Sequence, residues 1–568
     1  MKMYLLITHL LLHLALFYSV NAQTIILDES ISDWSDNDIV ANEKGDNTTL
    51  DFETLSVSND ETYLFLRLKI NNELLLQSNS NILFALDIDN NAQTGFAVEG
   101  IGSELIFNFG NRTGKIYRGN NDFEIFHDDI GLITSPTVSS DEFEIAIERR
   151  FNVGGTEYFI GNDISFYFLD NRGSTSDYIP NRGNAARYTL NENLISNNSN
   201  FQIEKDPLSD FRILSYNVRR DDIFDPSKAE AYQNILQTLI PDVFCFQEIY
   251  DNSAQDVYDR LISWNVLDPN DEWFLAKNGN DIITISKFPI KFDREIGGNG
   301  MIVLDVNNRD VIVFNLHLPC CDNDQGRVNE IDQMLALIRE SKNGNSSYPF
   351  AENSPIVILG DMNFVGFSSQ VNSIINGDVI NTSQYGNDFS IDWDNSGLAD
   401  LIPQTTGFSS SFTWKNTSSS FFPGRLDYIF YTDSQLESLN SLVFNTRGIN
   451  EQALLSNNLN LRDTETASDH SPLISDFKFK VEVSNSKPIV NQYLKFYPNP
   501  ATDRIFVESN NKAKEINVYA VDGTLIIKHM EDLSSSTFLE VEVLQSGYYI
   551  LEVLLIDGTY LRKPFVKK

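Results

Sequence analysis

The sequence predicts a multidomain chain, with an all-β part at each end and an α/β domain between them. Short segments of alternating apolar and polar residues fill residues 23–190 and 489–568, as in strands that bury one face. Between residues 209 and 482, apolar runs alternate with segments of helical periodicity, which is typical of a sheet covered by helices. The length of 568 residues is also too great for one ordinary domain.

Composition narrows the possible functions. A hydrophobic content of 41% with 12% aromatic residues is sufficient for full cores, so the chain is not disordered throughout. With 42 basic and 80 acidic residues, the formal charge is −38. Such a surface repels polyanions at long range, which argues against tight nucleic-acid binding through a broad basic face. A divalent cation held in a cleft would still attract a phosphate locally.

The first 22 residues indicate a secretory signal peptide. Lys2 precedes an apolar run over residues 4–20, and Val20-Asn21-Ala22 fits the small-residue rule for cleavage after Ala22. A membrane anchor is the alternative, although the run is short and polar sequence follows it at once. The three cysteines of the chain are too few for a disulfide framework.

Residues 23–190 predict a β-sandwich, because strand-like segments follow one another without a helix of useful length. These segments are residues 63–68, 82–86, 104–109 and 143–147. The arrangement of Asp33-Trp34-Ser35-Asp36, the loop 87–95 and the segment 143–147 resembles the family 9 carbohydrate-binding-module-like sandwiches. The resemblance implies that this part binds a glycan. Glycan sites usually present exposed aromatic side chains, and Trp34 is the one tryptophan of this part.

The loop over residues 87–95 has two interpretations. Asp87, Asp89 and Asn91 place oxygen atoms at alternate positions, and Ca²⁺ prefers oxygen ligands. An EF-hand is excluded, because the glycine and the closing glutamate are not at the required positions. A polar hairpin without an ion is the other interpretation.

Residues 191–208 are rich in Asn and Ser and indicate a linker. After them the periodicity changes. A helix-like segment begins near Asp225-Pro226 and ends before Pro241, and a second one, over residues 328–338, lies between two apolar runs. We therefore expect an α/β domain over residues 209–482.

The stretch over residues 355–363 is central to this domain. Five apolar residues in a row indicate a strand that is buried on both faces, and Gly360 permits a sharp turn at its end. Asp361 and Asn363 would then lie at the carboxyl edge of the sheet, where α/β proteins bind ligands. Taken alone, Gly-Asp-Met-Asn would equally fit a turn that Asp and Asn cap.

Similar polar residues end the other predicted strands. In chain order these strand ends are Asn217, Gln247-Glu248, Asn315-Leu316-His317, Gly360-Asp361-Met362-Asn363, Arg425-Leu426-Asp427-Tyr428-Ile429 and Ser468-Asp469-His470-Ser471-Pro472. This ordered set resembles the endonuclease/exonuclease/phosphatase superfamily, to which DNase I belongs, over residues 211–479. The resemblance implies a DNase I-like four-layer α/β sandwich that hydrolyses phosphate esters.

Three of these residues are candidate metal ligands. Glu248 is an oxygen ligand suited to Mg²⁺ or Mn²⁺, and Asn217 would serve beside it as a neutral ligand or phosphate contact. The resemblance implies that Asp469 is a further ligand. Singly, each has a plainer interpretation as a solvated charge, a turn former or a loop cap. Together, those interpretations would require that all six motifs occur by chance and in the same order along the chain as in the family.

The resemblance also implies five catalytic residues. His470 and Asp427 would form an imidazole–carboxylate pair at the phosphate, where a charged imidazole is useful. Asp361 would orient or deprotonate the attacking water, and Asn363 would steady the developing oxyanion. His317 would donate a hydrogen bond to a phosphate oxygen. Some apurinic endonucleases of the superfamily have tyrosine at this last position, so the histidine favours the DNase I-like and sphingomyelinase-like members.

Residues 489–568 form the third predicted part. Phe496-Tyr497-Pro498-Asn499-Pro500-Ala501-Thr502-Asp503 opens it, Gly547-Tyr548-Tyr549 begins a strand, and a basic segment ends it. These features resemble the C-terminal sorting domain of type IX secretion substrates in Bacteroidetes. The resemblance implies recognition by the type IX secretion machinery, and a protein that is secreted or attached to the outer cell surface.

The predicted activity is a divalent-metal-dependent hydrolysis of phosphodiesters in extracellular nucleic acid. A sphingomyelinase-like phospholipase and a small-molecule phosphatase are the alternatives, because each substrate presents a phosphate ester to the same residues. A non-enzymatic surface adhesin is a further class. It is disfavoured because a domain without activity would be expected to lose some of the six motifs, and all are present.

Overall fold

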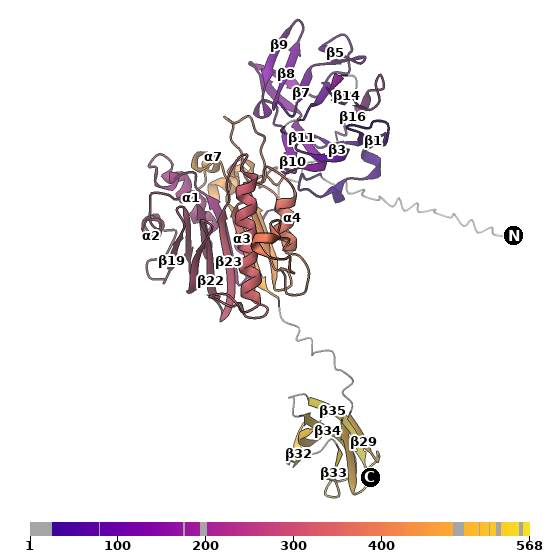
Figure 1. Ribbon diagram of the computed structural model, residues 1–568, viewed down its shortest axis with the longest axis vertical. Coiled ribbons are helices and arrows are strands. Elements are labelled where there is room, and N and C mark those ends of the chain that lie inside the picture. Colours follow the sequence, from indigo (N-terminus) through magenta and orange to yellow (C-terminus); the bar gives the residue numbers. More distant parts are fainter. Residues whose placement is uncertain are drawn as a thin grey trace, which may run out of the picture. The chain divides into compact units, whose positions relative to one another are not determined.

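The computed structural model describes residues 25–78, 80–173, 176–192, 201–480, 494–509, 512–521, 523–529, 536–555 and 560–568 (Figure 1). The predicted signal peptide and residues 193–200 of the predicted linker lie outside the described residues. The chain forms two compact units, one up to Lys480 and one from Val481 onward. Among the described residues, no helix is long and apolar enough to cross a membrane.

The first part of the larger unit consists of two antiparallel sheets that enclose a common core. One has the strand order β1-β2-β3-β11-β10, with bounds Ile39–Asn42, Phe52–Asn59, Tyr63–Leu74, Ser140–Glu148 and Ile133–Ser135. The other has the order β15-β14-β4-β7-β8-β9, with bounds Tyr178–Ile179, Asp163–Asp170, Ile82–Asp87, Leu105–Asn108, Thr113–Arg118 and Asn121–Ile125. β16 (Ala186–Thr189) also pairs with β14. Two hairpins complete this part: β5 (Phe96–Val98) pairs with β6 (Ile101–Ser103), and β12 (Arg150–Val153) pairs with β13 (Thr156–Phe159). The predicted β-rich N-terminal part is confirmed, and we call it the sandwich.

Strand β3 shows why the sandwich forms where it does. Leu64, Leu66 and Leu68 alternate along the strand and enter the core between the sheets. Phe65 points to the opposite face and packs with Trp34 in a second cluster. Trp34 is only 8% exposed, and its Nε1 donates to Glu144 Oε1 at 2.9 Å. The tryptophan is therefore part of a buried layer and not an exposed aromatic platform, and the resemblance to carbohydrate-binding modules finds no support.

The α/β domain has four layers. One six-stranded sheet has the order β19-β20-β18-β17-β28-β27, with bounds Phe274–Asn278, Ile282–Ser286, Val243–Gln247, Phe211–Asn217, Leu473–Phe479 and Leu436–Val443. The second has the order β21-β22-β23-β24-β26-β25, with bounds Ile290–Ile296, Asn299–Val306, Arg309–His317, Ile356–Asp361, Asp427–Tyr431 and Ala399–Leu401. One apolar core lies between the sheets, and helices cover both outer faces (Figure 1). This arrangement confirms the predicted fold class.

Helices α1 (Ala229–Leu239) and α2 (Ala254–Ser263) cover the first sheet, and α3 (Asp324–Lys342) and α4 (Ser369–Asn376) cover the second. The two predicted helices correspond to α1 and α3. Shorter helices are α5 (Thr382–Tyr385), α6 (Glu451–Ser456), α7 (Asp463–Ala467) and the 3-10 turns Ile31–Asp33, Asp36–Asp38, His127–Asp129, Asp222–Phe224 and Thr446–Gly448.

Strand direction brings the polar strand ends together. β17 runs parallel to β18 and ends beside it, with Asn217 opposite Gln247. β23 runs parallel to β24, with His317 opposite Asp361, and antiparallel β26 begins with Asp427 opposite Asp361. Because the parallel strands end on the same side, their terminal side chains converge at one edge of the paired sheets.

A segment of the α/β domain enters the sandwich. Phe422 is 1% exposed and belongs to the sandwich core, where its ring lies 5.7 Å from that of Phe107. Arg425 is also buried, and its guanidinium contacts Asp400 at 2.7 Å and Glu29, a residue before the first sandwich strand, at 3.1 Å. The sandwich and the α/β domain therefore share buried contacts within one compact unit.

The smaller unit is all β. Its three-stranded sheet has the order β29-β30-β33, with bounds Leu494–Tyr497, Arg504–Ser509 and Ser536–Glu540. Its four-stranded sheet has the order β32-β31-β34-β35, with bounds Leu525–His529, Ala513–Ala520, Gly547–Leu555 and Tyr560–Lys567. Side chains from both sheets share one core, so the predicted all-β C-terminal part is confirmed.

Candidate active site

Asn217, Glu248 and Asp361 form the floor of the site. The Asn217 Nδ2 amide donates to Glu248 Oε1 at 3.1 Å and to Asp361 Oδ2 at 2.9 Å. Asn217 and Asp361 are the last residues of β17 and β24, one from each sheet. The amide therefore connects the two sheets at the edge that the sequence predicted as the ligand site.

The backbone around the floor adopts unusual conformations. Glu248, the residue after β18, has a φ of 64°, in the left-handed region that few glutamates occupy. Its Oε2 accepts a hydrogen bond from the backbone N–H of Arg220 at 2.9 Å. Gly360 has φ 134, and an added Cβ would lie 1.9 Å from the backbone oxygen of Leu316. Glycine is thus required at 360 because β23 approaches β24 too closely for a side chain.

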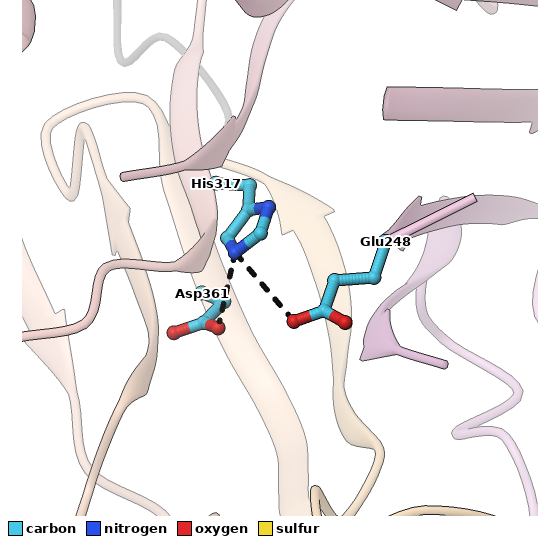
Figure 2. A group of neighbouring side chains, drawn as sticks. All are labelled: Glu248, His317 and Asp361. Atoms are coloured by element: carbon cyan, nitrogen blue, oxygen red, sulfur yellow. Dashed lines mark ion pairs between the residues drawn. The ribbon is translucent and has the colours of Figure 1, made fainter. Parts of the chain in front are cut away.

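His317 lies above Glu248 and Asp361 (Figure 2). Its Nε2 is 3.8 Å from Glu248 Oε1 and 3.7 Å from Asp361 Oδ2, while its Nδ1 contacts Asp281 Oδ2 at 2.5 Å. Asp281 was not predicted. It precedes β20, which runs antiparallel to β18, so the start of this strand lies at the site, and the pattern of polar residues at strand ends does not include it.

A second histidine faces Asp361 from the other side. His470 Nδ1 contacts Asp427 Oδ2 at 2.8 Å, and its Nε2 lies 3.8 Å from Asp361 Oδ2. Asp427 is held by Thr413, whose Oγ1 accepts from the Asp427 backbone N–H at 2.9 Å. The predicted imidazole–carboxylate pair is therefore present in the geometry, and the two imidazoles face the same carboxylate.

The charges of these groups follow from their surroundings. Burial opposes protonation of both histidines, but Asp281 raises the pKa of His317 to about 9, and Asp427 and Asp361 raise the pKa of His470 to about 10. Burial also raises the pKa of Asp361 to about 6, although both imidazoliums oppose this shift. At neutral pH both imidazoles are accordingly cationic and can donate hydrogen bonds through Nε2. They lie among four carboxyl groups, those of Glu248, Asp281, Asp361 and Asp427, and this excess of carboxyl groups favours a bound cation.

Asn363 and Asp469 occupy different places. The Asn363 Nδ2 donates to the backbone oxygen of Leu318 at 3.0 Å and to Asp361 Oδ2 at 3.1 Å, so the amide lies directly beside the floor. Asp469 lies at the rim, where its Oδ2 accepts from Trp414 Nε1 at 3.3 Å and from Asn416 Nδ2 at 3.1 Å. The structure thus brings together seven of the eight predicted residues and places Asp469 next to them.

Within the described part of the chain, two groups at this site have potential metal-ligating atoms within 4.8 Å of one another: Glu248 with His317 and Asp361, and Asp361 with Asp427 and His470. Asp469 belongs to neither. Carboxylate oxygens are the ligands that small divalent cations prefer, and Glu248 Oε2 has only a backbone donor. The donor set of Glu248 and Asp361 therefore fits a divalent cation.

The residues predicted for calcium are brought together only in part. The carboxylates of Asp87 and Asp89 lie within 4.8 Å of Glu104, which was not predicted. The Asn91 Oδ1 instead accepts from the backbone N–H of Gln93 at 3.1 Å, and the backbone N–H of Asn91 donates to Asp87 Oδ1 and Asp89 Oδ1 at 3.0 Å each. These contacts are those of a polar turn.

Comparison with known families assigns two parts of the chain. Residues 214–470 match the Endonuclease/Exonuclease/phosphatase family, over the span that contains the site described above. This part is an endonuclease/exonuclease/phosphatase domain. Residues 495–567 match the Secretion system C-terminal sorting domain. The phosphoesterase domain is therefore exported, and the protein is secreted or attached to the outer cell surface.

Several solved structures are similar to about half of the chain. An endonuclease/exonuclease/phosphatase family protein from Leptotrichia buccalis is 17% identical, with 48% of this chain and 100% of that chain covered and a TM-score of 0.30. The human Nocturnin catalytic domain is 14% identical, with coverages of 48% and 94% and a TM-score of 0.29. Truncated Caenorhabditis elegans TDP2 is 16% identical, with coverages of 47% and 97% and a TM-score of 0.30. No curated protein matches the chain.

Proposed function

We propose that the protein is an extracellular, divalent-metal-dependent phosphodiesterase that acts on nucleic acid. The observation that carries this proposal is the placement of His317 Nε2 and His470 Nε2 at 3.7 and 3.8 Å from one oxygen of Asp361, with Glu248 and Asn217 alongside. Two cationic donors around a buried carboxylate suit a phosphate that is attacked by water.

In this mechanism, His317 and His470 donate hydrogen bonds to the phosphoryl oxygens. Asp361 accepts the proton of the attacking water as the water oxygen bonds to phosphorus, and the bond from phosphorus to the leaving oxygen breaks. The leaving oxygen then takes up a proton, so one water is consumed per ester bond. Asp281 and Asp427 each orient one imidazole through its Nδ1.

Glu248, with Asp361 beside it, would hold a Mg²⁺ or Mn²⁺ ion, and Asn217 would orient both carboxylates through its Nδ2. Such an ion neutralises negative charge on the phosphoryl and leaving oxygens when it is bound. Removal of metal with EDTA is therefore expected to abolish hydrolysis of bis-p-nitrophenyl phosphate, and Mg²⁺ or Mn²⁺ to restore it. Full activity of the metal-free protein would contradict the proposal.

Nucleic acid is favoured over the alternatives because it is an abundant phosphodiester outside cells, and a secreted scavenging enzyme needs only weak binding. The substrate class is tested by assaying plasmid DNA, RNA, sphingomyelin vesicles and inositol phosphates in parallel, at fixed low salt with Mg²⁺. We expect cleavage of DNA or RNA. Cleavage of sphingomyelin with intact DNA would instead assign a phospholipase, and phosphate release from monoesters alone would assign a phosphatase.

A further inference from the structure

A cavity of about 220 Å³ lies beside His470, because Asp469 and Ser471, the residues on either side of it, line the cavity. Four basic side chains line it, Arg219, Lys415, Arg447 and Arg462, in a protein that carries 42 basic and 80 acidic residues. Asp469, which precedes His470, lines it as well. We call this cavity the basic pocket. Its position next to the proposed phosphate site makes it a place where a second part of the same substrate would bind.

Two of the arginines present unused donors. Glu465 holds both, because its Oε1 contacts Arg447 Nε and its Oε2 contacts Arg462 Nε, each at 2.9 Å. The side chains of Arg447 and Arg462 remain 44% and 69% exposed. Among the described residues, no acceptor within hydrogen-bond distance engages their terminal Nη groups. Paired guanidinium groups of this kind are suited to a phosphate, which accepts several hydrogen bonds at once.

The sandwich holds another part of the lining of the basic pocket. Lys415 Nζ contacts Asp128 Oδ1 of the sandwich at 2.9 Å. A few residues further along, Arg112 of the sandwich stacks on Phe421 at 4.0 Å, and Phe422 is buried in the sandwich core. The sandwich therefore fixes the segment that carries Lys415 before any ligand arrives, and such preorganisation lowers the entropic cost of binding.

Carboxylates contact all four cations of the basic pocket. Glu465 pairs with Arg447 and Arg462, Asp128 pairs with Lys415, and Asp469 lies 3.7 Å from Arg219 Nε. Glu148 also lies within electrostatic range of Lys415 and Arg447. The feature that suits an anion is therefore the group of terminal Nη donors on Arg447 and Arg462, because several N–H groups that point at one phosphate bind it more strongly than a diffuse charge does.

We propose that the basic pocket binds a second phosphate of the substrate, next to the phosphate that is hydrolysed. This inference rests on the proposed function and narrows it, because a polynucleotide offers a neighbouring phosphate and a phospholipid such as sphingomyelin, with a single phosphate, does not. The required chemistry is shared with sugar bisphosphates, so the experiment must separate these two sources.

The test compares substrates that differ by one phosphate. We would measure kcat/KM for three substrates with the wild type and the Arg447→Gln/Arg462→Gln double variant. They are d(TpT), which has one phosphate, d(TpTpT), which has two, and the sugar bisphosphate fructose 1,6-bisphosphate. Loss of two charge-assisted contacts is expected to reduce kcat/KM on d(TpTpT) by about 10- to 100-fold, chiefly through KM, and at least five times more than on d(TpT). Arg294→Gln, an exposed arginine of β21 outside the basic pocket, is the matched control and should change none of these values.

Two outcomes would overturn the inference: an equal loss on both nucleotides, or no loss on either. A selective loss on a sugar bisphosphate, with d(TpTpT) unaffected, would support the basic pocket but overturn the polynucleotide assignment. If the wild type hydrolyses none of these substrates, the proposed function is wrong, but binding in the basic pocket is still untested. The basic pocket is then tested without turnover, by fluorescence anisotropy of fluorescein-labelled d(T)4 in EDTA, where the double variant should bind about 10-fold more weakly and equal binding would overturn the inference.

Discussion

Replacement of Asp281 by Asn tests the part of the site that the sequence did not predict. The substitution keeps the shape of the side chain and removes the charge that contacts His317 Nδ1 at 2.5 Å. A hydrogen bond to a charged group contributes about 1.5 to 3 kcal/mol, which corresponds to about 10- to 100-fold in rate if the contact acts in the transition state. We therefore expect kcat/KM on bis-p-nitrophenyl phosphate to fall by about that factor at pH 8.

The pH profile distinguishes this role from a structural one. In the wild type the pKa of His317 is raised to about 9, so its charged form is present at neutral pH and is lost as the pH rises through about 9. Without the Asp281 charge, burial lowers the pKa, and the charged form is lost at lower pH. The ratio of wild-type to variant kcat/KM should thus grow between pH 6 and pH 8.5.

The assay is kcat/KM at saturating Mg²⁺ over this pH range, together with thermal denaturation of both proteins. A ratio that does not change with pH would refute the reasoning, because Asp281 would then not control the charge of His317. A large fall in melting temperature with a constant ratio would assign Asp281 to folding alone.

Three further predictions concern the site and its support. His470→Ala and Asp361→Asn should each reduce turnover by about 100-fold or more with an unchanged circular dichroism spectrum, as expected for positioned acid–base groups, and near-normal rates in both would remove their roles. Gly360→Ala should lower the free energy of unfolding of the larger unit, measured in urea, by about 2 kcal/mol or more, because the new Cβ would lie 1.9 Å from a backbone oxygen. Gly298→Ala is the control, because Gly298 also has a positive φ but an added Cβ there would meet no atom within 4 Å. Phe422→Ala should cost about 3 to 5 kcal/mol of stability by leaving a cavity in the sandwich core, and a loss below about 1 kcal/mol would show that the segment does not depend on the sandwich.

The role of the sandwich differs from the one that its sequence suggested. Glycan binding followed only from the resemblance to carbohydrate-binding modules, and Trp34, the one tryptophan available for it, has a buried ring whose Nε1 donates to Glu144. The sandwich instead contributes Asp128 to a contact with Lys415 and encloses Phe422. Its contacts with the α/β domain include the segment that leads to Thr413 and Asp427, and also Gly366 and Ser368, which bond to Ser139.

Local patterns were sufficient to predict the strand ends that carry several of the site residues. The apolar run before Gly360 identifies a buried strand, and a buried strand that ends in Asp361 places a carboxylate at the sheet edge. The same reasoning found Asn217, Glu248 and His317, because all three end strands or directly follow them. In each case the information lies within a few residues along the chain, where strand pattern and turn chemistry operate.

The sequence by itself therefore determined the order of the domains, the strands and the residues at their ends, but tertiary structure decided which charges meet. Asp281 reaches His317 because β20 runs antiparallel to β18, and strand direction depends on pairing between distant segments. The cations of the basic pocket come from three distant segments, which no local pattern relates. Charges interact through distance in space and through burial, and both are set only when the sheets pack and the sandwich closes on the segment that carries Lys415.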